Sequence, residues 1–591
     1  MILKALTEYY EALVKQGEVA EEGWSQAKVS YAITIDKDGK VRNVQSLLNE
    51  VESGKKKVLV PTQKTVPLQK GRQGPSSGKS PYFLCDSAKF LLGAWLPSGN
   101  EEKDLKEAKS ARDYFAEACK LHKNILARVE DEQAQKLCRF FSSWDFEKDK
   151  NCLNVSVDSL LGANLVFRDY EKSEDDFLEN AKIRAAWLAW MERENVEISQ
   201  GRCLVTGKHT TIARLHPQIR GIRDAQPSGA ALVSFNSASL ESYGKSQGDN
   251  APVSEYVANA YGKALSYLIM QRECHQQIGN TTVVYWSGTG ESAYSECMSN
   301  LLGMFEETDE DKLQEIMASI AQGKKSRYRE TDLNPNAEFY ILGISPNAAR
   351  LSVRFFYAGT FGRFVSNLVE HYKRLEIQKQ DSATKPPSVY QLLRETVNQK
   401  SSKKEIQPIL VGKMMDAVLN NTMYPENVYT SLMLRMRADK EVRNWRRTAF
   451  IKAYLIKNKP QWKGVVDTMK LNEETDCAAY LLGRLFAVLE EVQETASPGV
   501  NTTVKDKYFN SACATPASVF PILLKLSNAH MRTLKRDKRG LAITIEKKLE
   551  GILDKVRNSF PSTMTLEEQG IFILGYYHQH QKRFETNKED K

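Results

Sequence analysis

The sequence predicts an α+β protein: a mixed α/β N-terminal and middle region followed by an all-helical C-terminal bundle. Two observations support this prediction. Between residues 201 and 372, β-branched and aromatic runs alternate with turn residues, as is typical of strands with helices between them. After residue 389 the apolar residues recur at spacings of three and four, which indicates amphipathic helices. We expect four regions, at 1–200, 201–388, 389–468 and 469–591.

The N-terminal region is expected to begin with an amphipathic helix over 2–16, because its apolar residues fall on one side and Gly17 ends it. Short strands and a basic stretch follow. Another helix is expected after Asp86 or Ser87, since either side chain can cap its N-terminus. Residues 100–200 are predicted to be mainly helical.

The middle region is expected to contain a sheet with one helix, at 254–270, between its strands. The predicted strands lie at 202–207, 230–236, 281–286, 338–344 and 349–357.

The C-terminal third is expected to be helical throughout. Two polar stretches, at 379–388 and 501–507, have the composition of linkers. The last 120 or so residues contain four amphipathic segments, which predict a four-helix bundle.

The composition is that of an ordinary globular chain of several domains, with 591 residues, 41% hydrophobic content and a net charge of +9. No apolar run approaches the roughly 18 residues that cross a membrane. The first residues carry acidic and basic groups at helical spacing, unlike a signal peptide. Nine cysteines include no C-x-x-C pair, which indicates reduced thiols. We therefore expect a cytoplasmic protein that does not bind membranes.

The best clue to function is the stretch 55–79, which contains seven lysines and arginines and no acid. Three prolines and three glycines argue against a helix, so we expect exposed, irregular structure that attracts a polyanion, phosphate above all. The alternative is a solvated linker. Lysine attracts phosphate whatever the sequence, whereas arginine and glutamine can also bond base edges. The candidate DNA contacts are Lys64, Lys70, Arg72 and Lys79 for phosphates and Gln69, Gln73 or Arg72 for bases.

Two further basic segments are candidates for DNA contact. In 214–223 basic and apolar residues alternate beside glycine and proline; the alternative there is an edge strand protected by its charges. In 433–452 several arginines fall within one arc at helical spacing, where the alternative is a solvated face. The candidates are Arg214, Arg220, Arg223 and Asn236 in the first surface, and Arg443, Arg446 and Arg447 in the second.

The sequence carries no catalytic motif. It contains no H-E-x-x-H, and its G-x-S-x-G match at 244–248 lacks the strand and helix that a nucleophile elbow needs. We therefore predict no catalytic residue, no metal site and no cofactor. The rival hypothesis is a metal-dependent nuclease that uses Glu174, Asp175 and Asp176, and a third possibility is a structural scaffold.

Several groups of residues along the chain match the pattern of one known family. They resemble the large subunit of the type I-C CRISPR surveillance complex, Cascade, over nearly the whole chain. The matching groups are YFLCD at 82–86 with AKFLLG at 88–93, CLVTG at 203–207 with LHP at 215–217, SGA at 228–230 with VSFN at 233–236, ESYG at 241–244 with NAPVS at 250–254, FYILG at 339–343 with SPNAAR at 345–350 and GTF at 359–361, and YLLGRL at 480–485.

The resemblance implies a non-catalytic subunit of an RNA-guided complex. Its N-terminal part would recognise the short motif (PAM) beside the target in double-stranded DNA and start strand separation, and its bundle would support the displaced strand of the R-loop. The implied partners are the guide RNA, the backbone and guide-processing subunits, the small subunit, and a helicase–nuclease recruited after target binding. In this family the small subunit is made from inside the same gene. Met469 fits as that start and leaves a 123-residue product.

Overall fold

The computed structural model of the chain is an α+β protein, as predicted, with two compact units. Unit 1 comprises residues 1–217 and 234–267, and unit 2 comprises 218–233 and 268–591. The predicted bounds at 200, 388 and 468 do not coincide with this division. The residues described are 1–53, 56–69, 80–172, 176–194, 200–235, 237–303, 310–379, 386–398, 400–402, 405–499, 502–556 and 559–585.

Unit 1 is built on a four-stranded sheet with the order β3-β2-β7-β6, in which β2 and β7 run parallel. Its core lies between this sheet and helices α3 and α4, where Phe140, Phe141 and Phe167 meet edge to face. The helix predicted at 2–16 is confirmed as α1. The elements are α1 (Ile2–Lys15), β2 (Tyr31–Ile35), β3 (Val41–Ser46), β6 (Asp86–Ser87), α2 (Ala88–Leu91), α3 (Glu101–Leu126), α4 (Glu132–Ser143), α5 (Phe146–Asp149), α6 (Val157–Leu160), β7 (Asn164–Asp169) and α7 (Ala181–Glu194).

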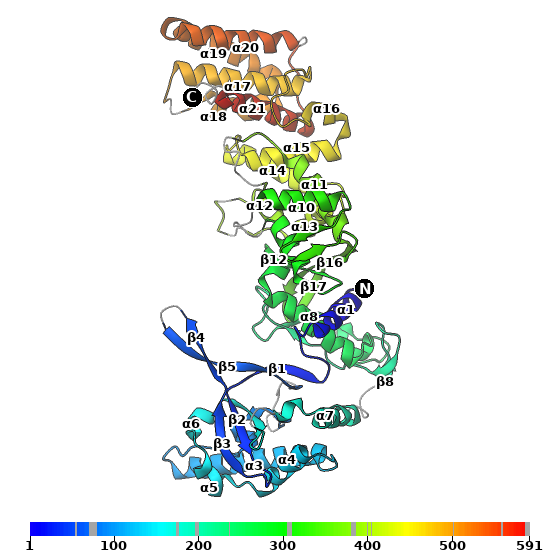
Figure 1. The fold of residues 1–591 in the computed structure, drawn as a ribbon. Helices are drawn as coiled ribbons and strands as arrows, with labels where there is room; N and C mark the ends of the chain where they lie inside the picture. The colour runs from blue at the N-terminus through cyan, green and yellow to red at the C-terminus, as the bar shows by residue number, and fades with distance from the viewer. Residues whose placement is uncertain are drawn as a thin grey trace. The chain divides into compact units, whose positions relative to one another are not determined.

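A second sheet of unit 1 is antiparallel and has the order β1-β5-β4 (Figure 1). The long strand β5 (Lys56–Pro67) pairs with β4 (Leu48–Ser53) along its first half and with β1 (Trp24–Val29) along its second. Unit 1 also includes the ribbon of β8 (Gln200–Arg202) and β9 (His209–Thr211), and most of α8 (Glu255–Met270), the predicted helix at 254–270.

Unit 2 contains a six-stranded sheet with the order β10-β11-β17-β16-β13-β12, in which the β11–β17 pair is the parallel one. Predicted strands at 281–286, 338–344 and 349–357 are confirmed, whereas 202–207 and 230–236 form only short strands beside turns. The elements are β10 (Gln218–Ile219), β11 (Ala230–Ala231), β12 (His275–Ile278), β13 (Thr281–Ser287), α9 (Ser292–Leu301), α10 (Glu310–Ala321), β14 (Ser326–Tyr328), β15 (Thr331–Leu333), β16 (Glu338–Asn347), β17 (Arg350–Thr360) and α11 (Phe361–Leu375).

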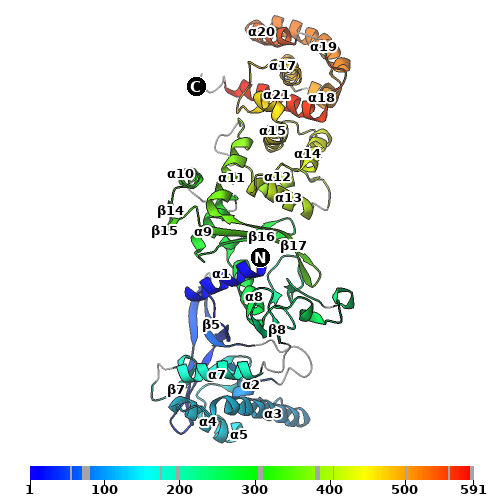
Figure 2. The ribbon, with the colours of Figure 1, turned by 90° about the vertical axis from the view of Figure 1, so that its right-hand side faces the viewer.

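The described residues after 389 form only helices, as predicted. Figure 2 shows α17 and α21 crossing and the α19–α20 hairpin beside them. The bundle has one helix more than predicted, because Thr503 and Asp506 form a capping box that starts α18 inside the predicted linker at 501–507. The helices are α12 (Val389–Arg394), α13 (Pro408–Leu419), α14 (Glu426–Asp439), α15 (Trp445–Asn458), α16 (Lys463–Val466), α17 (Ala478–Ala496), α18 (Val504–Ala514), α19 (Pro516–Asp537), α20 (Arg539–Lys555) and α21 (Leu566–Glu585).

None of the helices in the described part of the chain is both long and apolar enough to span a bilayer.

Candidate nucleic-acid interface

The basic stretch 55–79 is not irregular throughout, and that prediction is wrong for residues 56–67, which form β5. Val58, Val60, Thr62 and Val66 alternate along the strand, and β1 and β4 pair with its backbone. Pro67 is tolerated because it ends the strand. Lys64 lies at 2.5 Å from Asp176 (Nζ to Oδ2), and its side chain is 19% exposed, so its charge is already paired inside unit 1.

The described residues on either side of 70–79 are anchored within unit 1. Gln69 donates its side-chain amide to the carbonyl of Cys85 (2.8 Å), and its backbone N–H donates to Ser25 Oγ (3.3 Å). Its amide is therefore used as an anchor and does not face a base. After the stretch, Tyr82 N donates to Asp86 Oδ2 (2.7 Å). Gln69 and Tyr82, on either side of 70–79, are thus anchored to the neighbouring residues Cys85 and Asp86. The predicted contacts Lys70, Arg72, Gln73 and Lys79 lie outside the described residues.

The second predicted surface is divided between the two units. Arg214 is exposed on unit 1, where it bonds Gln247 Oε1 (2.5 Å). Arg220 and Arg223 are exposed on unit 2, and Arg223 lies 3.9 Å from Asp224. Asn236 lies outside the described residues. The three arginines keep the exposure that a phosphate contact requires.

The predicted arginine arc at 433–452 is largely turned inward. Arg447 is 1% exposed and bonds both Glu395 Oε2 and Asp439 Oδ2 at 2.9 Å. Arg443 reaches the bundle, where it lies 2.9 Å from the buried Glu490. Arg446 is 39% exposed and lies beside the ring of Trp445. Arg447 is therefore buried and Arg443, which is 32% exposed, is paired with Glu490, so both stabilise helix packing in place of the predicted DNA contact, whereas Arg446 keeps its exposure.

An exposed basic patch that the sequence analysis missed lies at the turn between α19 and α20. No described acid pairs with Arg532, Lys538 or Arg539, whereas Lys535 pairs with Glu546 and Arg536 with Asp537. The sequence signal was available, because residues 532–539 contain five basic groups and one acid. We call the following set the α19–α20 patch: Arg532, Lys535, Arg536, Lys538 and Arg539, all exposed.

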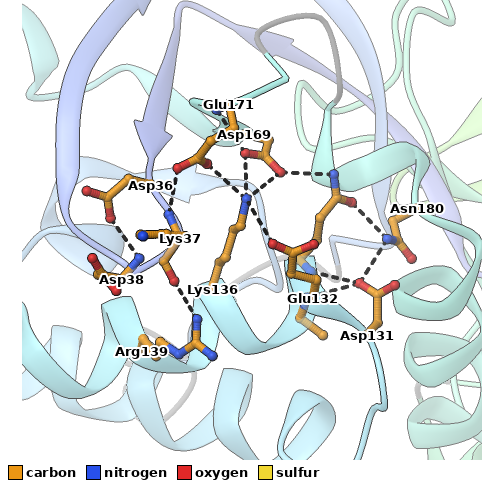
Figure 3. A network of polar contacts seen from close by, with 12 residues as sticks. Asp36, Lys37, Asp38, Asp131, Glu132, Lys136, Arg139, Asp169, Glu171 and Asn180 are labelled. Atoms are coloured by element: carbon orange, nitrogen blue, oxygen red, sulfur yellow. Dashed lines mark hydrogen bonds and ion pairs between the residues drawn. The ribbon is translucent and has the colours of Figure 1, made fainter.

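A network of carboxylates in unit 1 surrounds Lys136 (Figure 3). Its Nζ lies 2.9 Å from both Asp169 Oδ1 and Glu171 Oε2. Burial alone would lower the pKa of Lys136, but these hydrogen bonds raise it, and the bond from Lys136 lowers the pKa of Glu171 to about 2. An ammonium ion thus fills the position that a metal ion would need, and the network is structural.

The rival metal site is not supported by the described residues. Asp176 is buried, pairs with Lys64 and accepts a hydrogen bond from Leu178 N (3.3 Å), which caps a short helix. Glu174 and Asp175 lie outside the described residues. Elsewhere in the described chain no group of three or more His, Cys, Asp or Glu residues has the arrangement of a metal site.

The segment that follows Met469 packs against the bundle. Asn472 N donates to Tyr480 Oη (3.0 Å), and Arg484 Nη1 donates to the carbonyl of Asn472 (3.4 Å). Lys555 also bonds the carbonyl of Glu473. Met469 itself is half-exposed (51%). A product that started there would contain both partners of each of these contacts, because all of them follow Met469 in the sequence.

A family model for a CRISPR-associated protein (Cas_Csd1) matches residues 6–584 of the chain. Among curated proteins, none matches it.

Proposed function

Because this chain belongs to the Cas_Csd1 family of CRISPR-associated proteins, we propose that it is the large subunit of an RNA-guided surveillance complex of type I-C, without catalytic activity of its own. It binds target double-stranded DNA, recognises the flanking motif, promotes strand separation and recruits a separate helicase–nuclease. Its other partners are the guide RNA and the backbone, guide-processing and small subunits.

The exposed α19–α20 patch is the observation that supports DNA binding best. Five cations within eight residues, three of them unpaired by any described acid, create a local positive field on the bundle. Exchange of a DNA duplex for an RNA–DNA duplex is nearly balanced, so a few phosphate contacts can decide whether the R-loop persists. We assign the displaced strand to this patch.

The flanking duplex is assigned to the stretch 70–79. Lys70, Arg72 and Lys79 would contact phosphates, and Arg72 or Gln73 base edges. The anchored flanking residues support this role, because Gln69 and Tyr82 are already held in place before DNA binds and add no ordering cost of their own.

The displaced-strand assignment is tested on the assembled complex with Arg532, Lys538 and Arg539 replaced by Ala. Loss of three single-strand phosphate contacts should make the slope of log affinity against log salt about 2 units less steep. The matched control replaces Lys103, Lys106 and Lys109, three exposed lysines on α3, by Ala. An unchanged slope, or an equal change in the control, would remove the patch from the interface.

The duplex assignment is tested in the same way with Lys70, Arg72 and Lys79 replaced by Ala and a target duplex as the ligand. Three lost contacts should reduce the slope by about 2.7 units. Unchanged affinity and slope would exclude the stretch. Incubation of the purified protein with DNA and Mg²⁺ or Mn²⁺ should give no cleavage.

A further inference from the structure

Unit 1 presents one tyrosine side chain almost completely to solvent. Tyr243 is 99% exposed, more than any other large hydrophobic side chain among the described residues. It lies in the loop 237–250, all of which belongs to unit 1. An aromatic ring offers a large area for contact, so its full exposure leaves that area open to a ligand.

The backbone at Tyr243 adopts a left-handed conformation that tyrosine rarely takes. Its φ is +55°, and that of Gly244 is +68°. Lys245 N donates to the carbonyl of Ser242 (3.0 Å), so residues 242–245 form a β-turn whose two central residues have positive φ, the pattern of a type I′ turn. Glycine, asparagine and aspartate dominate these positions, and a bulky side chain there is strained. The turn therefore carries a ring where folding alone favours a smaller residue.

Hydrogen bonds hold the loop in place around this turn. Asn250 Oδ1 accepts a hydrogen bond from Ser242 N–H (2.9 Å). Asn250 Nδ2 donates to the carbonyls of Lys245 (3.1 Å) and Gln247 (3.0 Å). Gly248 packs tightly on a neighbouring segment, because a Cβ there would lie 2.0 Å from a backbone carbonyl oxygen. The ring is thus presented by a preformed loop, which reduces the ordering cost of binding.

Two exposed cations belong to the loop or are bonded to it. Lys245 is exposed, and no described acid pairs with it. Arg214 is exposed, and its Nε donates to Gln247 Oε1 (2.5 Å), a bond that leaves its charge in place. The two acids of the loop, Glu241 and Asp249, are half-buried, and Glu241 accepts a hydrogen bond from Gln247 N–H (3.0 Å). Since cations and acids are equal in number, the ring and not net charge selects the ligand.

The surroundings of the ring fit a nucleobase better than a protein surface. Within the loop, the other apolar side chain larger than alanine, Leu240, is half-buried. Ser242, Gly244 and Ser246 are exposed and carry no large apolar group. A protein hot spot is enclosed by further contacts that exclude water. A nucleobase needs only one free aromatic face, with a cation near its phosphate.

We propose that Tyr243 binds an unpaired nucleobase of a single strand by stacking, while Lys245 and Arg214 contact the adjoining phosphates. The proposal rests on the nucleic-acid-binding role proposed above, but it assigns a site in unit 1 that acts through a ring, unlike the α19–α20 patch, which acts through charge. Every base has a face for stacking, so the base comes either from the target DNA where its strands separate or from the guide RNA.

The first measurement uses the full-length chain and fluorescence anisotropy. The probes are a labelled ten-nucleotide oligothymidine and a labelled abasic strand of the same length, which has the same phosphates. The parent should bind oligothymidine at least about fivefold more tightly than the abasic strand. Tyr243→Asn should remove this preference without changing the slope of log affinity against log salt, because no phosphate contact is lost. Tyr243→Trp should keep the preference, since it retains an aromatic ring.

The control variant is Tyr170→Asn, which makes the same change at a 51% exposed tyrosine of unit 1 and should leave the preference unchanged. Misfolding cannot imitate the result for Tyr243→Asn, because asparagine suits a left-handed turn better than tyrosine does. Its unfolding temperature should be equal to or above that of the parent.

The second measurement identifies the strand that supplies the base. In the assembled complex, 5-bromouracil is placed in the target DNA or in the guide RNA, and ultraviolet cross-links are mapped after trypsin digestion. Tyr243 is the only tyrosine of the tryptic peptide 224–245. A cross-link to this residue in one arm should identify the source of the base.

Three outcomes would overturn the proposal: no preference of the parent for oligothymidine over the abasic strand, an unchanged preference in Tyr243→Asn, or no cross-link to Tyr243 in either arm. If the α19–α20 patch variants still change the salt slope, these outcomes remove only the stacking site. If those variants also have no effect, the DNA-binding role proposed for the bundle fails as well.

Discussion

Replacement of the buried Arg447 by Met tests whether the arginine arc stabilises the helices or contacts DNA. Its guanidinium is 1% exposed and joins Glu395, at the end of α12, to Asp439, at the end of α14. Met retains most of the apolar stem but leaves both carboxylates, each 15% exposed, without their cation. Removal of one partner of a buried ion pair costs about 3–5 kcal/mol. Because the two acids are partly exposed, we expect the free energy of unfolding to fall by about 3 kcal/mol, the lower end of this range.

Amide hydrogen exchange measured by mass spectrometry over α14 and α15 reports the loss of local stability in these two helices. A loss of about 3 kcal/mol raises the opening equilibrium, and with it the exchange rate, roughly 160-fold. The control Arg536→Met removes a 77% exposed arginine and should change exchange by less than a factor of about 3. If Arg447→Met leaves exchange unchanged and weakens DNA binding, the stabilising role is refuted and the sequence-based prediction is correct.

Three further predictions concern the bundle, the buried histidines and the internal start. Gly575→Ala should destabilise the bundle by about 1–3 kcal/mol or more, because the new Cβ would lie 2.2 Å from the carbonyl oxygen of Tyr480 on α17. Gly551→Ala adds a Cβ in open space and should stabilise the bundle by up to about 1 kcal/mol. In thermal denaturation the unfolding temperature of the first variant should lie below that of the parent, and that of the second above it. Burial lowers the pKa of His122 to about 4 and of His371 to about 3, so below pH 6.5 the unfolded chain takes up protons that the folded chain does not. The free energy of unfolding should therefore fall by about 2 kcal/mol per histidine between pH 6.5 and 5. An unfolding temperature that does not change over this pH range would contradict the burial of neutral histidines. Met469→Leu in the gene should abolish the 123-residue C-terminal product while full-length protein persists, and persistence of the short band on a C-terminal tag blot would exclude Met469 as its start.

Periodicity predicted the elements whose local pattern matches their final environment. The helix at 254–270 and the strand at 281–286 appear within one residue of their predicted bounds, because each buries its apolar residues at the expected spacing. β5 was missed because its prolines and lysines outweighed a real alternation of valine and threonine, and because its pairing strands β1 and β4 are distant in sequence. The start of α18 was missed because Thr503, read as a linker residue, is the N-cap.

Charge alone could not distinguish the paired arginines of 433–452 from the exposed arginines of the α19–α20 patch, because the sequence does not show which acids the fold brings close to each arginine. Arg447 meets Glu395 from 52 positions away, and Arg443 meets Glu490 from the bundle. Position along the helices does not separate the two sets. Arg443 lies in the turn before α15, Arg446 and Arg447 lie in the first turn of α15, and the α19–α20 patch also lies where two helices meet. What differs is the set of acids that the fold brings close. Glu395, Asp439 and Glu490 pair with Arg447 and Arg443, whereas among the described acids only Glu546 and Asp537 pair with cations of the patch, which leaves the other three exposed to a phosphate.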